Sequence, residues 1–137
     1  MKYKPHDYQA YATNFILEHP ISAVFLDMGL GKSVITLSAI FDLCLDYFSV
    51  RKVLVIAPLR VARDTWPTEI QKWDHLNGLS YSVAVGTEAE RKAALQQRVF
   101  LPQLLVLSWE FIPRCLGMLL RFALQEGGRA PSGRVII

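Results

Sequence analysis

FLDMGLGKS, residues 25–33, is the stretch that decides the fold, because it joins a short apolar run to a helical pattern through a glycine-rich turn. A phosphate-binding loop requires this order of strand, Gly-Lys-Ser turn and helix. Gly29 and Gly31 can adopt backbone conformations closed to other residues, which lets main-chain N–H groups approach a polyphosphate. The pattern therefore predicts a phosphate cradle between a strand at residues 23–27 and a helix that begins near Lys32.

Two side chains of this loop carry chemistry. The Lys32 ammonium can reach the outer phosphates of a nucleotide, and the Ser33 hydroxyl can ligate Mg²⁺. The general loop pattern has a glycine six residues before the lysine, where this sequence has Leu26. The alternative is a glycine turn with an incidental lysine, which would leave the coincidence of strand, turn, Gly-Lys-Ser and helix unexplained.

The rest of the sequence alternates between two periodicities, which is typical of an α/β domain. Apolar runs suited to strands buried on both faces of a parallel sheet lie at residues 52–58, 80–85, 104–109 and 134–137. Helical patterns lie at residues 9–18, 32–48, 67–73, 87–97 and 111–125. Thr87 with Glu90 forms a capping box at the start of one of them. We expect a mainly parallel sheet with helical crossovers.

Composition limits the class of protein. The 137 residues, 52% of them hydrophobic, suffice for one folded domain but not for the paired lobes of a complete nucleic-acid motor. The net charge of +3 is mild, and the basic residues are scattered, so charge gives only a weak indication of a nucleic-acid partner. Cys44 and Cys115 lie in apolar helical patterns, where a free thiol behaves as a small hydrophobe.

The sequence shows no sign of a membrane or secreted protein. Its longest apolar stretch, residues 33–50, is interrupted by Asp42 and Asp46, whose carboxylates a bilayer core would penalise heavily. The first residues have no apolar run behind their lysines. We expect a cytoplasmic protein.

Residues 27–33 resemble motif I of the Swi/Snf-type branch of the superfamily-two helicases, especially its bacterial and phage members. That family favours Met-Gly-Leu-Gly-Lys followed by Ser or Thr, which accounts for the missing first glycine. The resemblance implies a three-layer RecA-like domain that binds ATP and Mg²⁺, with Lys32 as a catalytic group and Ser33 as a metal ligand. It implies an ATP-binding set made of Gln9, Asp27, Met28, Gly29, Leu30, Gly31, Lys32 and Ser33.

Gln9 enters this set through Tyr8-Gln9, which resembles the family's glutamine motif. In that motif the glutamine amide pairs with adenine through one donor and one acceptor, so Gln9 would select ATP. The family often has an arginine three residues earlier, where this sequence has His6.

Two further stretches resemble the family's DNA-contacting motifs. Residues 53–73 are similar to motif Ia and its following helix, and residues 104–111 to motif Ib. The resemblance implies contacts to the DNA phosphate backbone from Pro58, Leu59, Arg60, Ser108 and Trp109. Alternatively, Arg60 and Arg63 form a solvated helix edge, and Ser108 and Trp109 a structural strand end; Trp66 and Trp73 are interpreted as core. Gly86-Thr87 and Arg91 also resemble phage members, but we assign them only a turn and a helix start.

The family's Asp-Glu pair, which follows a strand of the Val-Ile-Ile type, does not occur before the last residue, Ile137. We therefore interpret residues 1–137 as an incomplete helicase ATP-binding lobe that holds the glutamine motif and motifs I, Ia and Ib, truncated before motif II. Such a DNA-dependent ATPase would hydrolyse ATP only with its missing parts. The expected partners are double- or single-stranded DNA, bound through phosphates, and the absent C-terminal lobe. The alternatives are a non-catalytic nucleotide- or DNA-binding module and an unrelated phosphate-loop kinase.

Overall fold

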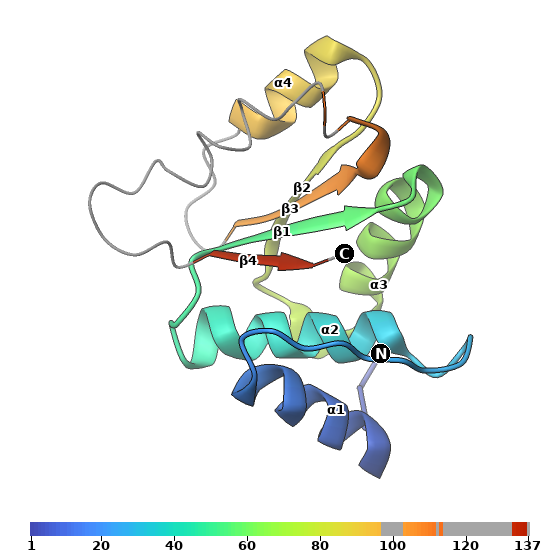
Figure 1. The fold of residues 1–137 in the computed structure, drawn as a ribbon, viewed down its shortest axis with the longest axis vertical. Helices are drawn as coiled ribbons and strands as arrows, with labels where there is room; N and C mark the ends of the chain where they lie inside the picture. The colour runs from blue at the N-terminus through green and yellow to red at the C-terminus, as the bar shows by residue number, and fades with distance from the viewer. Residues whose placement is uncertain (97–102, 112, 114–132, 137) are drawn as a thin grey trace.

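A four-stranded parallel sheet forms the centre of the computed structural model, which describes residues 1–96, 103–111, 113 and 133–136 (Figure 1). The strands are β1 (Lys52–Ala57), β2 (Ser80–Ala84), β3 (Gln103–Ser108) and β4 (Gly133–Ile136), in the spatial order β2-β3-β1-β4. Every neighbouring pair is parallel. The register aligns Ala84 with Leu107 and Ala57 with Ser108, so three strands end together at one edge of the sheet, the carboxyl edge.

Helices lie on both faces of this sheet, which makes three layers (Figure 1). One side carries α2 (Lys32–Phe41) and α3 (Trp66–Lys72), and α1 (Asp7–Glu18) packs against α2. The other side carries α4 (Glu88–Gln96). Short segments complete the order: the π-helical turns η1 (Asp42–Asp46) and η2 (Val61–Thr65) and the 3-10 turns η3 (Asp74–Leu76) and η4 (Trp109–Phe111). The sequence-based prediction of an α/β domain with a parallel sheet is confirmed.

The core is divided by the sheet. The larger cluster lies between the sheet and the α2/α3 layer, and it contains Leu37, Ile40, Val53, Val55, Trp66, Ile70, Leu104 and Val106. A smaller cluster of Ala84, Leu105 and Leu107 packs against Ala94 and Phe111 on the α4 side. Leu104 through Ser108 are all buried, as predicted for a strand covered on both faces, whereas β1 alternates buried and half-buried positions. Burial of one such leucine contributes roughly 1.5–3 kcal/mol.

One predicted strand is wrong. Residues 23–27 have no regular secondary structure, and Phe25 is 92% exposed. The reason is that a strand needs a hydrogen-bonded neighbour, and these residues pair with none of the described strands. The predicted helix at residues 111–125 lies largely outside the described residues, whereas the predicted burial of Trp66 is confirmed.

Candidate nucleotide and nucleic-acid site

The glycine-rich loop has the backbone that the sequence predicted. Gly29 and Gly31 have φ angles of 83° and 80°, in the left-handed region that favours glycine. Gly31 is the N-cap of α2, and its carbonyl accepts the hydrogen bond from Ile35 N at 3.0 Å. The helix therefore begins at Lys32, with its unpaired N–H groups and positive dipole end at the loop.

The Lys32 ammonium lies across its own loop. Its Nζ donates to the carbonyl oxygens of Leu26, at 2.7 Å, and Asp27, at 2.9 Å. Both bonds are exposed to solvent, so an anion in the loop could compete for the ammonium hydrogens. Ser33 is half-buried beside it, and Met28 is 94% exposed.

Gln9 ties α1 to this loop. Its Nε2 donates to Leu30 O at 3.3 Å, and its Oε1 accepts from His6 N at 3.0 Å, as part of the cap of α1. Tyr8 donates its hydroxyl to the same Leu30 carbonyl at 3.2 Å, and Tyr3 donates to Gln9 Oε1 at 3.5 Å. Because an amide nitrogen carries two hydrogens, Gln9 keeps one donor beyond its bond to the loop. The roles of Tyr3 and Tyr8 were missed in the sequence, where only the position of Tyr8 beside Gln9 hinted at one.

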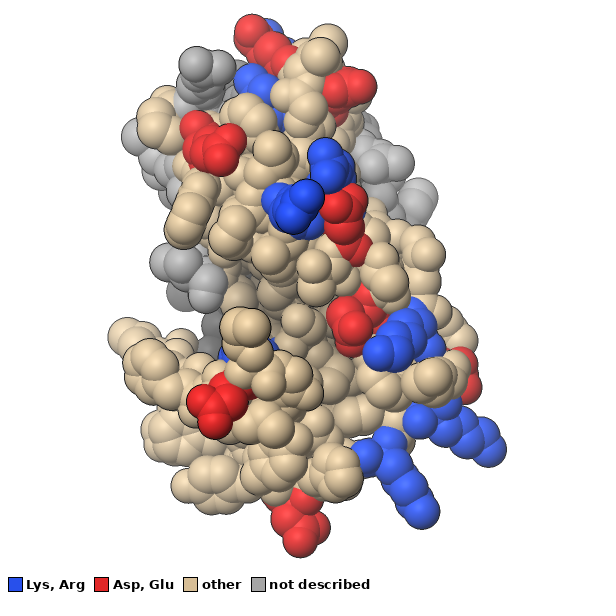
Figure 2. Space-filling model, turned by 90° about the vertical axis from the view of Figure 1, so that its right-hand side faces the viewer, with Lys and Arg blue, Asp and Glu red and all other residues tan. Residues whose placement is uncertain are grey.

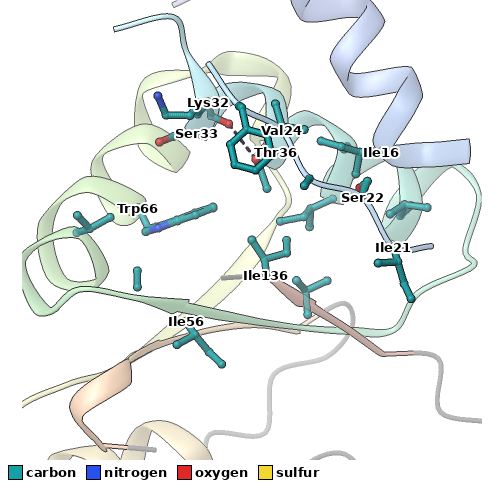
Figure 3. A pocket seen from close by; sticks show the side chains of 18 of the residues that line it. Ile16, Ile21, Ser22, Val24, Lys32, Ser33, Thr36, Ile56, Trp66 and Ile136 are labelled. Carbon is teal, nitrogen blue, oxygen red and sulfur yellow. Dashed lines mark hydrogen bonds between the residues drawn. The ribbon is translucent and has the colours of Figure 1, made fainter. Parts of the chain in front are cut away.

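A cleft of about 650 Å³ opens beside the loop, between α2, β1 and the loop residues 20–25 (Figure 3). Lys32 and Ser33 lie at one end of it and Ile21 at the other (Figure 3). Its other labelled side chains are mainly apolar, among them Val24, Trp66 and Ile136. Its size lies within the usual range of small-molecule pockets, about 300–1,000 Å³.

The turns named in the sequence as DNA contacts gather at the carboxyl edge. Pro58 and Arg60 are exposed after β1, and Trp109, directly after β3, is 55% exposed. Leu59 is half-buried. Ser108 differs: its side chain is fully buried, and its Oγ has no hydrogen-bond partner among the described residues. The Ser108 hydroxyl therefore does not reach the surface in this conformation.

The basic side chains near this edge are not equivalent. Arg63 forms a two-pronged ion pair with Asp64, at 2.9 and 3.0 Å, and hydrogen bonds to Arg63 lower the pKa of that exposed carboxyl. Arg60 is exposed, and none of the carboxylates in the described part of the chain forms an ion pair with it. Figure 2 views the side toward which the strands of Figure 1 point, and there Lys and Arg lie in separate groups with Asp and Glu among them.

Comparison with known sequences agrees with this arrangement of loop and sheet. A family model described as the SNF2-related domain matches residues 16–119, which include the loop, α2 and strands β1 to β3. The chain belongs to the SNF2-related domain family. Membership places it in the helicase-like ATPase superfamily, and the predicted resemblance to Swi/Snf-type proteins is confirmed.

The SNF2-related chain also has a phage relative. It is 39% identical to protein p41 of Acyrthosiphon pisum secondary endosymbiont phage 1 over 94 residues. That match covers 69% of this chain but only 20% of p41, so the chain spans about a fifth of the relative's length.

Two features are absent from the described residues of this SNF2-related domain. No helix among them is long and apolar enough to cross a membrane. No three of their His, Cys, Asp and Glu side chains gather in a way that could hold a metal ion.

Proposed function

We propose that residues 1–137 belong to the ATP-binding first lobe of a DNA-dependent ATPase of the Swi/Snf type. The observation that carries the proposal is the loop at residues 29–33, where two left-handed glycines lead into a helix that begins at Lys32. SNF2-family membership supports ATP as the ligand and DNA as the partner. Translocation on DNA, a second lobe of the same protein and a cytoplasmic location belong to the same proposal.

ATP phosphates bind at the loop in this proposal. The main-chain N–H groups of residues 29–33 and the first turn of α2 attract the phosphate oxygens. Lys32 leaves the carbonyls of Leu26 and Asp27 and donates to the outer phosphates, a stronger charge-assisted pairing. The Ser33 hydroxyl would hold Mg²⁺, which suits a cation that binds few protein ligands and would supply charge to offset that of the phosphates.

Adenine recognition falls to Gln9. Its remaining amide hydrogen can donate to the base, and its Oε1 can accept from the base if the long Tyr3 contact yields. Because the same amide bonds Leu30 O, base recognition and loop conformation depend on one side chain.

DNA binds through phosphates at the carboxyl edge, at Pro58, Leu59 and Arg60 of one turn and at Trp109 of the other. Ser108 can contribute only through its backbone unless its buried hydroxyl moves. Arg60 suits a phosphate because its guanidinium is exposed and has no ion-pair partner among the described residues. Phosphate contacts carry no sequence information, so we expect binding that is indifferent to sequence.

Calorimetry with ATP and Mg²⁺ tests the nucleotide site. Lys32→Ala should abolish measurable binding, whereas Lys92→Ala, which removes an exposed lysine on α4, should leave it unchanged. Gln9→Ala should mainly erase the preference for ATP over GTP. Equal ATP affinity in the Lys32 and Lys92 variants would reject the phosphate-loop assignment.

A further inference from the structure

Arg91 is a buried cation that the proposed function has not used. It lies on α4 with 7% of its surface exposed. Its Nη1 donates to the Gly86 carbonyl at 2.6 Å, and its guanidinium carbon lies 4.2 Å from the centre of the Phe111 ring. Its Nε is buried without a partner, and no carboxylate of the described residues pairs with it.

These contacts join two neighbouring strand ends. Gly86 lies just beyond β2, and Phe111 closes η4, which directly follows β3. The register of Ala84 with Leu107 brings these two ends side by side at the carboxyl edge. Arg91 therefore pins η4 to the turn after β2, and η4 begins with the exposed Trp109.

The contacts of Arg91 with the Gly86 carbonyl and the Phe111 ring indicate what the carboxyl edge binds. An arginine is suited to the position because its planar guanidinium can donate to a carbonyl while one face covers a ring. A buried charge without a carboxylate is costly, and neither a carbonyl nor a ring neutralises it. Among the described residues no ion pair neutralises the Arg91 charge, and Arg91 contacts Phe111 in the same short turn as the exposed Trp109. A cation and an exposed aromatic ring at one edge favour a polyanion that carries stackable bases.

We propose that Arg91 is a positioning residue for nucleic-acid binding: it fixes η4 so that Trp109 faces outward, and its charge attracts the phosphate backbone there. This inference rests on the proposed binding of DNA. A merely structural arginine would affect stability but would leave the affinity of the folded chain for DNA unchanged.

The test combines DNA affinity with a report on Trp109. Fluorescence anisotropy with a single-stranded oligonucleotide at low salt compares the parent chain with Arg91→Met, Arg91→Lys and Phe111→Leu, each confirmed as folded by urea denaturation. We expect Arg91→Met to weaken binding roughly tenfold, and the other two, which each keep the charge, to weaken it about threefold. Lys92→Ala, an exposed neighbour on α4, should leave affinity unchanged and serves as the matched control.

The double variant Arg91→Met/Phe111→Leu separates a shared contact from two independent effects. It should bind no more than about twofold weaker than Arg91→Met, because residues that act through one contact are not additive. Acrylamide quenching reports the position of Trp109, because Trp66 is buried and Trp73 half-buried. Arg91→Met and Phe111→Leu should both change the quenching constant, whereas Lys92→Ala should not.

Each outcome bears on a different claim. If the parent chain binds no DNA, the proposed function fails, while the quenching comparison still decides whether Arg91 positions Trp109. If the parent binds DNA and folded Arg91→Met and Phe111→Leu bind it equally well, the inference about Arg91 is overturned and DNA binding stands.

Discussion

Replacing each of the two loop glycines with alanine measures how closely α1 supports the phosphate loop. Gly29 and Gly31 have nearly the same left-handed backbone, so Gly29→Ala and Gly31→Ala carry a similar strain of about 1–2 kcal/mol. Their surroundings differ. A Cβ at Gly29 meets nothing within 4 Å, whereas a Cβ at Gly31 would lie 2.6 Å from Gln9 Nε2 and 3.2 Å from Val34 Cγ1.

The additional cost at Gly31 follows from what Gln9 must give up. Its amide can swing aside, but it then loses the hydrogen bond to Leu30 O, worth about 0.5–1.5 kcal/mol net. We therefore expect the free energy of unfolding to fall by about 1–2 kcal/mol for Gly29→Ala and by about 2–3 kcal/mol for Gly31→Ala.

Urea denaturation followed by tryptophan fluorescence measures both losses. In a Gln9→Ala background the obstructing amide is absent, so the difference between the two losses should shrink to what the 3.2 Å contact of the new Cβ with Val34 Cγ1 costs. Equal losses with Gln9 present would refute the reasoning, because they would show that Gln9 does not abut the loop.

Three further predictions concern ionisation and charge. Burial raises the pKa of the Cys44 thiol to about 11, so little of the reactive thiolate forms in the folded chain at pH 8. In a Cys115→Ser variant, iodoacetamide should therefore alkylate Cys44 far more slowly in the folded chain than in urea, and equal rates would contradict the burial of Cys44. Burial lowers the pKa of His75, so as the pH falls the unfolded chain takes up this proton before the folded chain does. The free energy of unfolding should therefore fall as pH drops below about 6.5, and more steeply than in His75→Gln, as urea titrations at several pH values would show. Arg60→Ala should reduce the slope of log affinity for duplex DNA against log salt by about 0.9, whereas Arg63→Ala, whose parent arginine is already paired, should change it less; similar slopes for both variants would argue against Arg60 as a phosphate contact.

The features predicted correctly from the sequence were those that depend on residues close together in the chain. The loop glycines and the helix start at Lys32 depend on neighbours within a few residues, and both were predicted. The capping box was also predicted: Thr87 N donates to Glu90 Oε2 at 2.7 Å, and Glu90 N donates to Thr87 Oγ1 at 3.3 Å. Each of these features is set by backbone geometry and short side chains, so no distant partner is needed.

Features that need distant partners were beyond the sequence. Residues 23–27 have strand-like composition, but composition does not supply a neighbouring strand. The contact of Arg91 with Phe111 joins residues twenty apart, and no sequence pattern in either segment predicts it. The burial of Ser108 is different, because the two-residue period of a strand places it on the same face as Leu104 and Val106 and could have predicted it.

The pairing of β1 with β4 has a consequence for how the chain assembles during synthesis. Their register joins Lys52 to Gly133, about eighty residues apart, so at translation rates of about 5–20 residues per second β1 waits roughly 4–16 s for this neighbour. The apolar face of β1 can be covered sooner, because α2 is synthesised before β1. Leu37 and Ile40 of α2 belong to the same cluster as Val53 and Val55 of β1. The helix that begins at Lys32 thus provides an apolar surface against which the sheet can assemble, as its strands emerge from the ribosome one after another.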